Sequence, residues 1–169
     1  MDYAELITEA ANLSGIPEFV SRAAMFTQQA EADLGRILST RQMETAATLT
    51  TDADGIAPLP ADFLRLRDIV DNGSIVIQGS NAWTTTKDGT VDIYYFAALP
   101  SIVTAGTNWL LETDPVLYLQ AVLLQAYTYH ADQRAAAIAP IIEARVRSLV
   151  RADKLAKFSG QRLDLTGAI

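Results

Sequence analysis

The sequence predicts a mainly helical α+β fold, a bundle of about four helices with a small antiparallel β insert and an extended C-terminal arm. Three observations predict it. Apolar residues recur at helical spacing towards both ends, and a threonine-rich middle alternates as strands do. The residues after 158 have no helical periodicity and only a lone alternation of Leu163 and Leu165. We expect a single helical-bundle domain over residues 1–157, with the insert at about 41–98, and a docking arm at 158–169.

Two amphipathic helices are expected before the insert. The first covers residues 2–12 and stops at Gly15, because glycine readily takes the left-handed conformation that ends helices. The second opens at Pro17, which a first helical turn tolerates, and runs to about Ser39. Apolar positions spaced by threes and fours predict the buried side of both helices: Leu6, Ala10, Leu13, Phe19, Ala23, Phe26, Ala30, Leu34, Ile37 and Leu38.

The middle of the chain predicts antiparallel strands joined by tight turns. Residues 41–51 alternate in the way that is typical of a half-buried strand. Asn72-Gly73 between two β-branched runs is a strong hairpin signal, so we expect residues 66–70 and 74–78 to pair. The other expectations are a short helical turn within 59–66, a hairpin between 83–86 and 90–97 around Asp88-Gly89, and a loop over 99–107.

The segment over residues 108–154 predicts two further helices, and the first of them is the expected core of the fold. Thr113 or Asp114 caps it, and Pro115 occupies its opening position, where a missing N–H costs nothing. Val116, Leu119, Leu123 and Tyr127 run at helical spacing, and further apolar residues widen that stripe. A helix that is apolar on most of its circumference must be covered on most sides.

The second of these helices is expected to be the outer, solvated partner. It begins near Asp132 and carries an apolar face of Ile138, Ile142, Val146 and Leu149. Pro140 lies inside it and should bend the helix or delay its regular part, because proline lacks an N–H and crowds the preceding turn.

The composition bounds the class of protein. The 169 residues hold 13 Lys and Arg against 20 Asp and Glu, and the net charge of −7 argues against wrapping nucleic acid. It does not exclude a surface along which DNA slides. No cysteine is present, which excludes disulfides and thiolate metal sites. No apolar run reaches the ~20 residues of a membrane span, and the start of the chain is acidic, so we expect neither a membrane span nor a signal peptide.

No set of residues predicts catalysis or cofactor binding. His130 is near Asp132, but no nucleophile motif accompanies them, which favours a helix-end position for the histidine. Asp52, Asp54 and Gly55 match only a fragment of a calcium loop, which favours a turn. No glycine-rich phosphate loop follows any expected strand. We therefore expect no enzymatic activity, no cofactor and no metal.

Four segments carry a family resemblance: RQMETAATLT at 41–50, LPADFLRLRDI at 59–69, VDIYYFAALP at 91–100 and NWLLETDPVLYLQAVLLQAYTY at 108–129. They resemble the phage head–tail connector and adaptor proteins, the gp6-like family that joins a portal ring to the tail. The resemblance implies a helical bundle with a β insert, a homo-oligomeric ring that is usually dodecameric, and a C-terminal segment that docks on the portal protein. It implies no enzymatic activity and no cofactor.

The same resemblance implies the remaining partners and the location. A tail or stopper protein would lie below the ring, and double-stranded DNA would pass through its lumen without specific binding. The protein would belong to the head–tail neck of the virion and would be assembled in the cytoplasm of the host bacterium.

The outer helix holds the densest basic cluster of the chain: Arg145, Arg147, Arg151, Lys154 and Lys157. Two interpretations stay open, a solvated helix face near the negative end of the helix dipole and a strip that pairs with an adjacent subunit or the portal. Acidic residues gather near the other end of the chain: Asp2, Glu5, Glu9, Glu18, Glu31 and Asp33. Such asymmetry suits head-to-tail ring contacts, in which unlike patches meet.

The expected docking arm has four apolar side chains, Phe158, Leu163, Leu165 and Ile169. Ordering it costs roughly 1–2 kcal/mol per residue, whereas burying each apolar side chain returns ~1.5–3 kcal/mol. Hydrogen bonds of an added strand would have to close the difference. One arm is then marginal, but many arms in a ring bind together. We expect a free chain that is mainly monomeric or weakly associated and that assembles on its portal.

The sequence favours a structural virion protein, the adaptor ring between portal and tail. A stopper or tail-completion ring protein of the neck is the nearer alternative. A small α+β DNA-binding or regulatory module is the alternative from another class, but it would need a basic recognition helix beyond the strip at 145–157.

Overall fold

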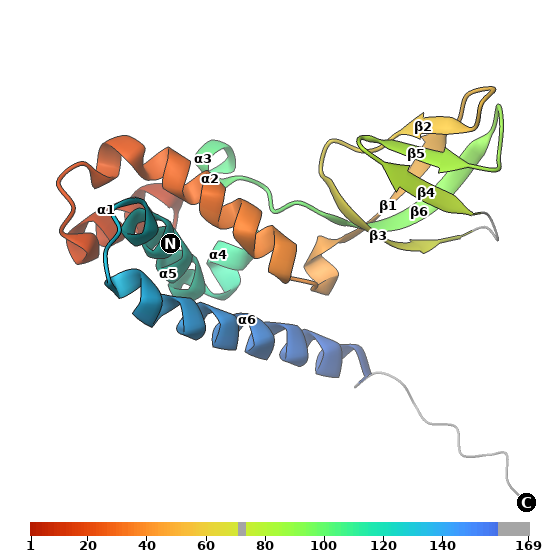
Figure 1. The fold of residues 1–169 in the computed structure, drawn as a ribbon. Helices are drawn as coiled ribbons and strands as arrows, with labels where there is room; N and C mark the ends of the chain where they lie inside the picture. The colour runs from red at the N-terminus through yellow and green to blue at the C-terminus, as the bar shows by residue number, and fades with distance from the viewer. Residues whose placement is uncertain (71–73, 159–169) are drawn as a thin grey trace, which may run out of the picture. The chain divides into compact units, whose positions relative to one another are not determined.

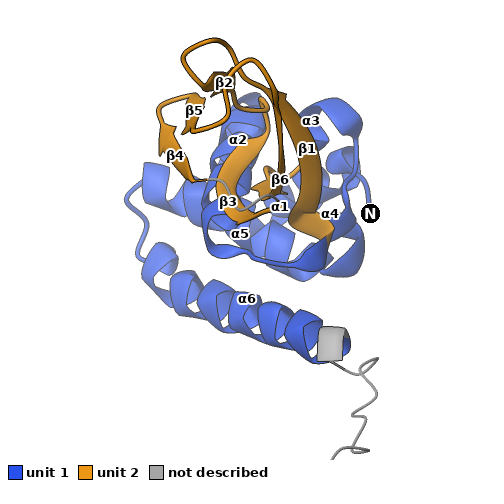
Figure 2. Ribbon diagram, turned by 90° about the vertical axis from the view of Figure 1, so that its right-hand side faces the viewer, with its two compact units in different colours: residues 1–41, 101–169 blue, residues 42–100 orange. Residues whose placement is uncertain are grey.

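The computed structural model describes residues 1–70 and 74–158 of the chain (Figure 1). It confirms the expected class, a mainly helical α+β fold with antiparallel sheets. The chain divides into two compact units, coloured separately in Figure 2. Unit 1 is Met1–Arg41 with Ser101–Ile169, and unit 2 is Gln42–Pro100. Residues 71–73 and 159–169, which include most of the expected arm, lie outside the described residues.

The first helix of unit 1, α1 (Tyr3–Ser14), is fixed at its start by a capping box and at its end by the glycine that predicted it. The Asp2 carboxylate accepts the backbone N–H of Glu5 at 2.8 Å, and the Glu5 carboxylate accepts that of Asp2 at 3.0 Å. These two bonds form a capping box. Gly15 ends the helix with φ 64°. The expectation for Leu13 was wrong, because its side chain points outwards and is 53% exposed.

Helix α2 (Phe19–Ile37) confirms the expected long amphipathic helix. All but one of its predicted buried positions are buried, together with Leu38 just after it. The exception is Ile37, which was predicted as buried and is 49% exposed, because it lies in the last turn beside an open groove.

Helix α5 (Pro115–Tyr129) is the core element of unit 1, as predicted. The Asp114 side chain accepts the backbone N–H of Leu117 at 2.9 Å, which caps its start. The helix packs against α1, α2 and α6 (Arg134–Phe158), so most of its circumference is covered. Only the edge of the predicted apolar stripe was wrong, because Val116 in the first turn is 43% exposed.

The described part of the chain holds six α-helices, against the four or so expected. The two additional ones are short. Helix α3 (Ile102–Ala105) lies in the expected loop, and α4 (Trp109–Thr113) precedes α5 as a separate turn. The Asn108 side chain caps α4 by accepting the Leu111 N–H at 3.0 Å, which is a local signal that the sequence analysis overlooked.

Helix α6 starts before Pro140 and continues through it, so the proline does not delay the helix. Ile142 and Val146 are buried against the rest of unit 1, whereas Ile138 and Leu149 are partly exposed. This is the outer helix that the sequence predicts.

Unit 2 consists of two three-stranded antiparallel sheets that share one small core. One sheet has the order β1 (Glu44–Thr50), β6 (Thr90–Ala97), β3 (Phe63–Ile69). The other has the order β2 (Ile56–Pro58), β5 (Asn81–Thr84), β4 (Ile75–Gln78). A short 3-10 helix, Arg41–Met43, leads into β1. The buried core residues come from both sheets: Leu49, Ala57, Ala82, Val91, Ile93 and Tyr95.

Both expected hairpins were wrong. Strand β3 pairs with β6 and strand β4 pairs with β5, so the segments around Asn72-Gly73 belong to different sheets. The hairpin that forms is β4–β5, and its two-residue turn contains Gly79 at φ 62°, the left-handed conformation that such turns need. The helical turn expected within 59–66 is reduced to one bond, from the Phe63 N–H to the Pro60 carbonyl at 3.0 Å, because β3 starts at Phe63.

Candidate interaction surface on the C-terminal helix

The structure separates the basic residues of α6 into two groups. Arg145 faces the rest of unit 1, where its guanidinium lies 3.2 Å from the Asp114 carboxylate that caps α5. Arg147 lies 3.6 Å from Glu143 on the same helix, with both side chains largely exposed, and such pairs contribute little. Among the described residues, Arg151 and Lys154 have no ion-pairing partner. Side chains beyond residue 156, including that of Lys157, lie outside the description.

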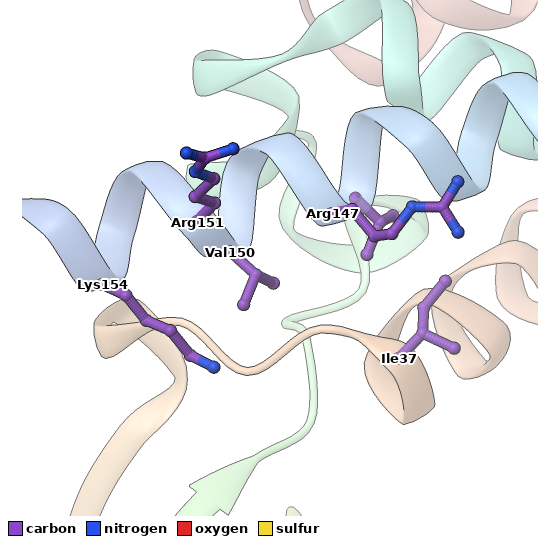
Figure 3. Close-up of a pocket in the computed structure, with 6 residues that line it drawn as sticks. Ile37, Arg147, Val150, Arg151 and Lys154 are labelled. Carbon is purple, nitrogen blue, oxygen red and sulfur yellow. The ribbon is translucent and has the colours of Figure 1, made fainter.

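Three of these basic residues line a groove at the end of α2, which we call the α6 groove. Its volume is about 360 Å³, and its lining is mixed, with aliphatic side chains next to cations (Figure 3). Figure 3 shows Val150 and Lys154 on the side of α6 that faces Ile37, with the guanidinium of Arg151 extending away from them. The full lining is Ile37, Val146, Arg147, Val150, Arg151 and Lys154.

The carboxylate that precedes Lys154 in the sequence, that of Asp153, is already paired within the chain. Asp153 accepts the backbone N–H of Arg41 at 3.0 Å and its Nε–H at 2.9 Å, and the Asp153 side chain is only 11% exposed. This pairing ties the C-terminal half of α6 to the chain just after α2. Because Asp153 is paired with Arg41, its carboxylate does not pair with Arg151 or Lys154. Ile37 also lines a second hollow of about 180 Å³, together with Asp33 and Glu143 among other residues.

We expect Asp153→Ala to destabilise unit 1 by about 1 kcal/mol, because two charge-assisted bonds at a partly exposed site are lost. Hydrogen exchange should accelerate in the C-terminal half of α6 more than elsewhere, and urea denaturation would give the loss in stability. Arg147→Ala is the matched control, since its exposed pair within one helix should contribute under about 0.5 kcal/mol. Equal effects of the two changes would contradict the role of Asp153.

The acidic patch expected near the start of the chain is smaller than the sequence suggested. Asp2, Glu5, Glu9, Glu18 and Asp33 are exposed, and Asp33 is paired with Arg36. Glu31 does not belong to the patch, because it is 8% exposed and its carboxylate accepts bonds inside unit 1.

Glu31 is the centre of a buried polar cluster that the sequence analysis did not identify. Its Oε1 accepts the backbone N–H of Ile102 and the hydroxyl of Tyr118, both at 2.7 Å. Asn108 donates to the same hydroxyl at 3.2 Å. Burial, together with the neighbouring carboxylate, raises the pKa of Tyr118 far above its ordinary value, so the phenol stays a donor. The cluster joins α2, α3, α4 and α5.

The weaker candidate sites behave as ordinary structural residues. His130 caps the end of α5, with its ring edge-on to Tyr129 at a centroid distance of 5.1 Å. The carboxylate of Asp132 accepts hydrogen bonds from the Arg134 side chain, which lower its pKa, so it serves Arg134 and not the histidine. Asp52 forms the turn that was expected, because its side chain accepts the N–H groups of residues 54 and 56.

The described residues contain no cluster of three or more His, Asp or Glu side chains that could hold a metal ion. No helix among them is long and apolar enough to cross a membrane. The α6 groove combines a hollow with exposed cations.

The predicted arm follows α6 in the sequence. Phe158 is the last residue of α6 by its backbone, while Leu163, Leu165 and Ile169 lie outside the described residues. Their role in docking stays a prediction.

Comparison with known proteins gives one family. The family model described as SU10 adaptor protein matches residues 1–86, which include α1, α2 and the strands as far as β5. No match was found among curated proteins.

Proposed function

This chain belongs to the SU10 adaptor protein family, because the family model covers slightly more than half of its residues, and on that premise we propose a structural role in the neck of a phage virion. As an adaptor-type phage protein it would form the ring that joins the portal to the tail. The family match is the observation that carries this proposal.

The proposed ring is homo-oligomeric and dodecameric, as the resemblance to gp6-like connectors implies. Its partners would be the portal protein above and a tail or stopper protein below. Double-stranded DNA would pass through the lumen. The net charge of −7 suits a channel that repels the DNA phosphates and does not bind them. The proposal requires no enzymatic activity and no cofactor.

Two features of the described chain support a role in assembly. The α6 groove combines aliphatic side chains with cations at the surface, which is the composition of an interaction surface and not of a catalytic site. The described part of α6 ends at Phe158, and the sequence after it carries the other three apolar side chains of the predicted arm.

The test is negative-stain imaging of the purified chain mixed with its portal. A second ring on the narrow end of the portal is the expected result. A ring that appears only beneath another adaptor would favour the stopper or tail-completion protein instead. Retardation of duplex DNA at moderate salt, without any ring, would point to the DNA-binding alternative.

A further inference from the structure

We propose that the α6 groove receives the acidic face of α1 from a second copy of this chain, so that copies associate head to tail. The acidic face is defined here by Glu5, Glu9 and Leu13, which are all exposed. This inference deepens the proposed ring and rests on it, because it names the surfaces through which neighbouring subunits meet.

The groove is suited to a polypeptide partner that presents both carboxylates and an aliphatic side chain. Ile37 is 49% exposed at its edge, and Val150 is only partly covered. Lys154 lies one helical turn after Val150 on the same side of α6, so an apolar and a cationic group are adjacent. A phosphate backbone would match the cations but would leave the aliphatic residues uncovered.

The acidic face of α1 offers the complementary pair. Glu9 and Leu13 are one helical turn apart on the exposed side, as Val150 and Lys154 are on α6. Leu13 is 53% exposed, and the Glu9 side chain has no ion pair or hydrogen bond in the described part of the chain. No Lys or Arg occurs in the first seventeen residues. Cations near α1 include the N-terminal ammonium, 3.6 Å from the Glu5 carboxylate, and Arg134, which donates to the Ser14 carbonyl at 3.1 Å, and neither is paired with Glu9. Two such helices can place leucine against the aliphatic residues and glutamate against lysine.

A chain cannot use its own α1 for this contact. Helix α1 is held by packing on α2 and α5 and by the bond from the Tyr3 N–H to the Gly106 carbonyl at 2.8 Å. In Figure 1, α1 and the C-terminal half of α6 lie towards opposite ends of unit 1. Different surfaces at opposite ends of one unit give a heterologous contact, which closes into a ring when the rotation between subunits allows it.

The contact is small and its ion pairs are exposed, so each one is weak. Weak single contacts agree with a chain that is mostly monomeric until a portal collects many copies.

Introduced cysteines provide the test, because the natural chain has none and every thiol is placed by design. Glu9→Cys and Lys154→Cys chains are prepared separately, mixed at high concentration and oxidised. A disulfide-linked pair is expected from the mixture, and a ladder of oligomers from the chain with both substitutions. Lys87→Cys, exposed in unit 2, replaces Glu9→Cys in the matched control and should give little product. Equal product in both mixtures overturns the proposal.

Charge reversal gives a second, independent test. Glu9→Lys and Lys154→Glu should each weaken self-association by about tenfold, measured by sedimentation equilibrium, and the chain with both changes should recover. The proposal is overturned if the single changes weaken self-association and the double variant does not recover it. It is also overturned if the groove binds duplex DNA and Lys154→Glu abolishes that binding. If imaging shows the ring on the portal but no specific cross-link forms, this inference fails while the proposed function stands. If no ring forms at all, the proposed function fails first.

Discussion

Deleting residues 163–169 is expected to abolish binding of the chain to its portal while both compact units stay folded. The deletion removes Leu163, Leu165 and Ile169, three of the four apolar side chains of the predicted arm. The helices and strands that the structure describes end at Phe158, before the deleted residues, and we expect the melting temperature to stay unchanged. Loss of binding without loss of folding would identify the arm as the anchor.

The size of the effect follows from multivalency. Burial of the two leucines contributes roughly 3–6 kcal/mol per arm before the cost of ordering, so one arm binds only weakly. In a ring every copy loses its arm at once, and the gain in effective concentration from linked binding is lost with it. Binding should therefore fall below detection and not by a small factor.

Surface plasmon resonance on immobilised portal rings, with circular dichroism on the same samples, would measure both quantities. Leu163→Asp with Leu165→Asp should reproduce the deletion at full chain length. Gln161→Ala changes a polar residue of the same arm and is expected to bind like the parent chain. A truncated chain that docks at full affinity would show that the anchor lies elsewhere, and the α6 groove would be the next surface to vary.

The helices of unit 1 could be predicted because their signals are local. The glycine at position 15 and the Asp114-Pro115 start of α5 each act within one helical turn. Strand pairing in unit 2 depends on contacts far apart in the sequence, such as Glu44 with Phe96 across β1 and β6. A turn signal cannot reveal such pairing, and the Asn72-Gly73 signal therefore gave the wrong partner for β3.

The candidate site could be predicted in part. The cations of α6 were visible as a cluster in the sequence, but the pairing of its charged residues was not. Arg145 pairs with Asp114, and Asp153 of the same helix pairs with Arg41, and both partners are distant in the sequence. Periodicity also placed Ile37 in the core, because spacing alone cannot tell that the last turn of α2 lies beside an open groove. Glu31 was grouped with the surface acids because its buried partners, Ile102 and Tyr118, are distant in the sequence.

Replacing Glu31 by leucine is expected to cost unit 1 about 2–5 kcal/mol. The change removes the acceptor of two donors, the Ile102 N–H and the Tyr118 hydroxyl, and both residues are fully buried. Each buried donor left without a partner costs about 1–3 kcal/mol, which is a large share of the ~5–15 kcal/mol that stabilises a typical domain. Glu31→Gln keeps one acceptor oxygen and should lose less.

Urea denaturation followed by tryptophan fluorescence can report on unit 1 alone. The chain has two tryptophans, and Trp83→Phe leaves Trp109, which follows the Asn108 of the cluster in the sequence. Every variant is compared with the Trp83→Phe chain, so the effect of that substitution on unit 2 cancels in the difference. A loss below about 1 kcal/mol for Glu31→Leu would mean that the two donors find other partners.

A double-mutant cycle decides whether the cluster acts as one unit. Tyr118→Phe removes the hydroxyl that donates to Glu31 and accepts from Asn108. As a single change, it therefore leaves the Glu31 carboxylate with one donor fewer. Once Glu31 is leucine, the same hydroxyl is a buried group without an acceptor, and removing it should restore part of the stability. We therefore expect the double variant to be more stable than the sum of the single losses by roughly 1–3 kcal/mol. Simple additivity would mean that Glu31 stabilises unit 1 mainly through the N–H of Ile102, and that Tyr118 contributes chiefly by the burial of its ring.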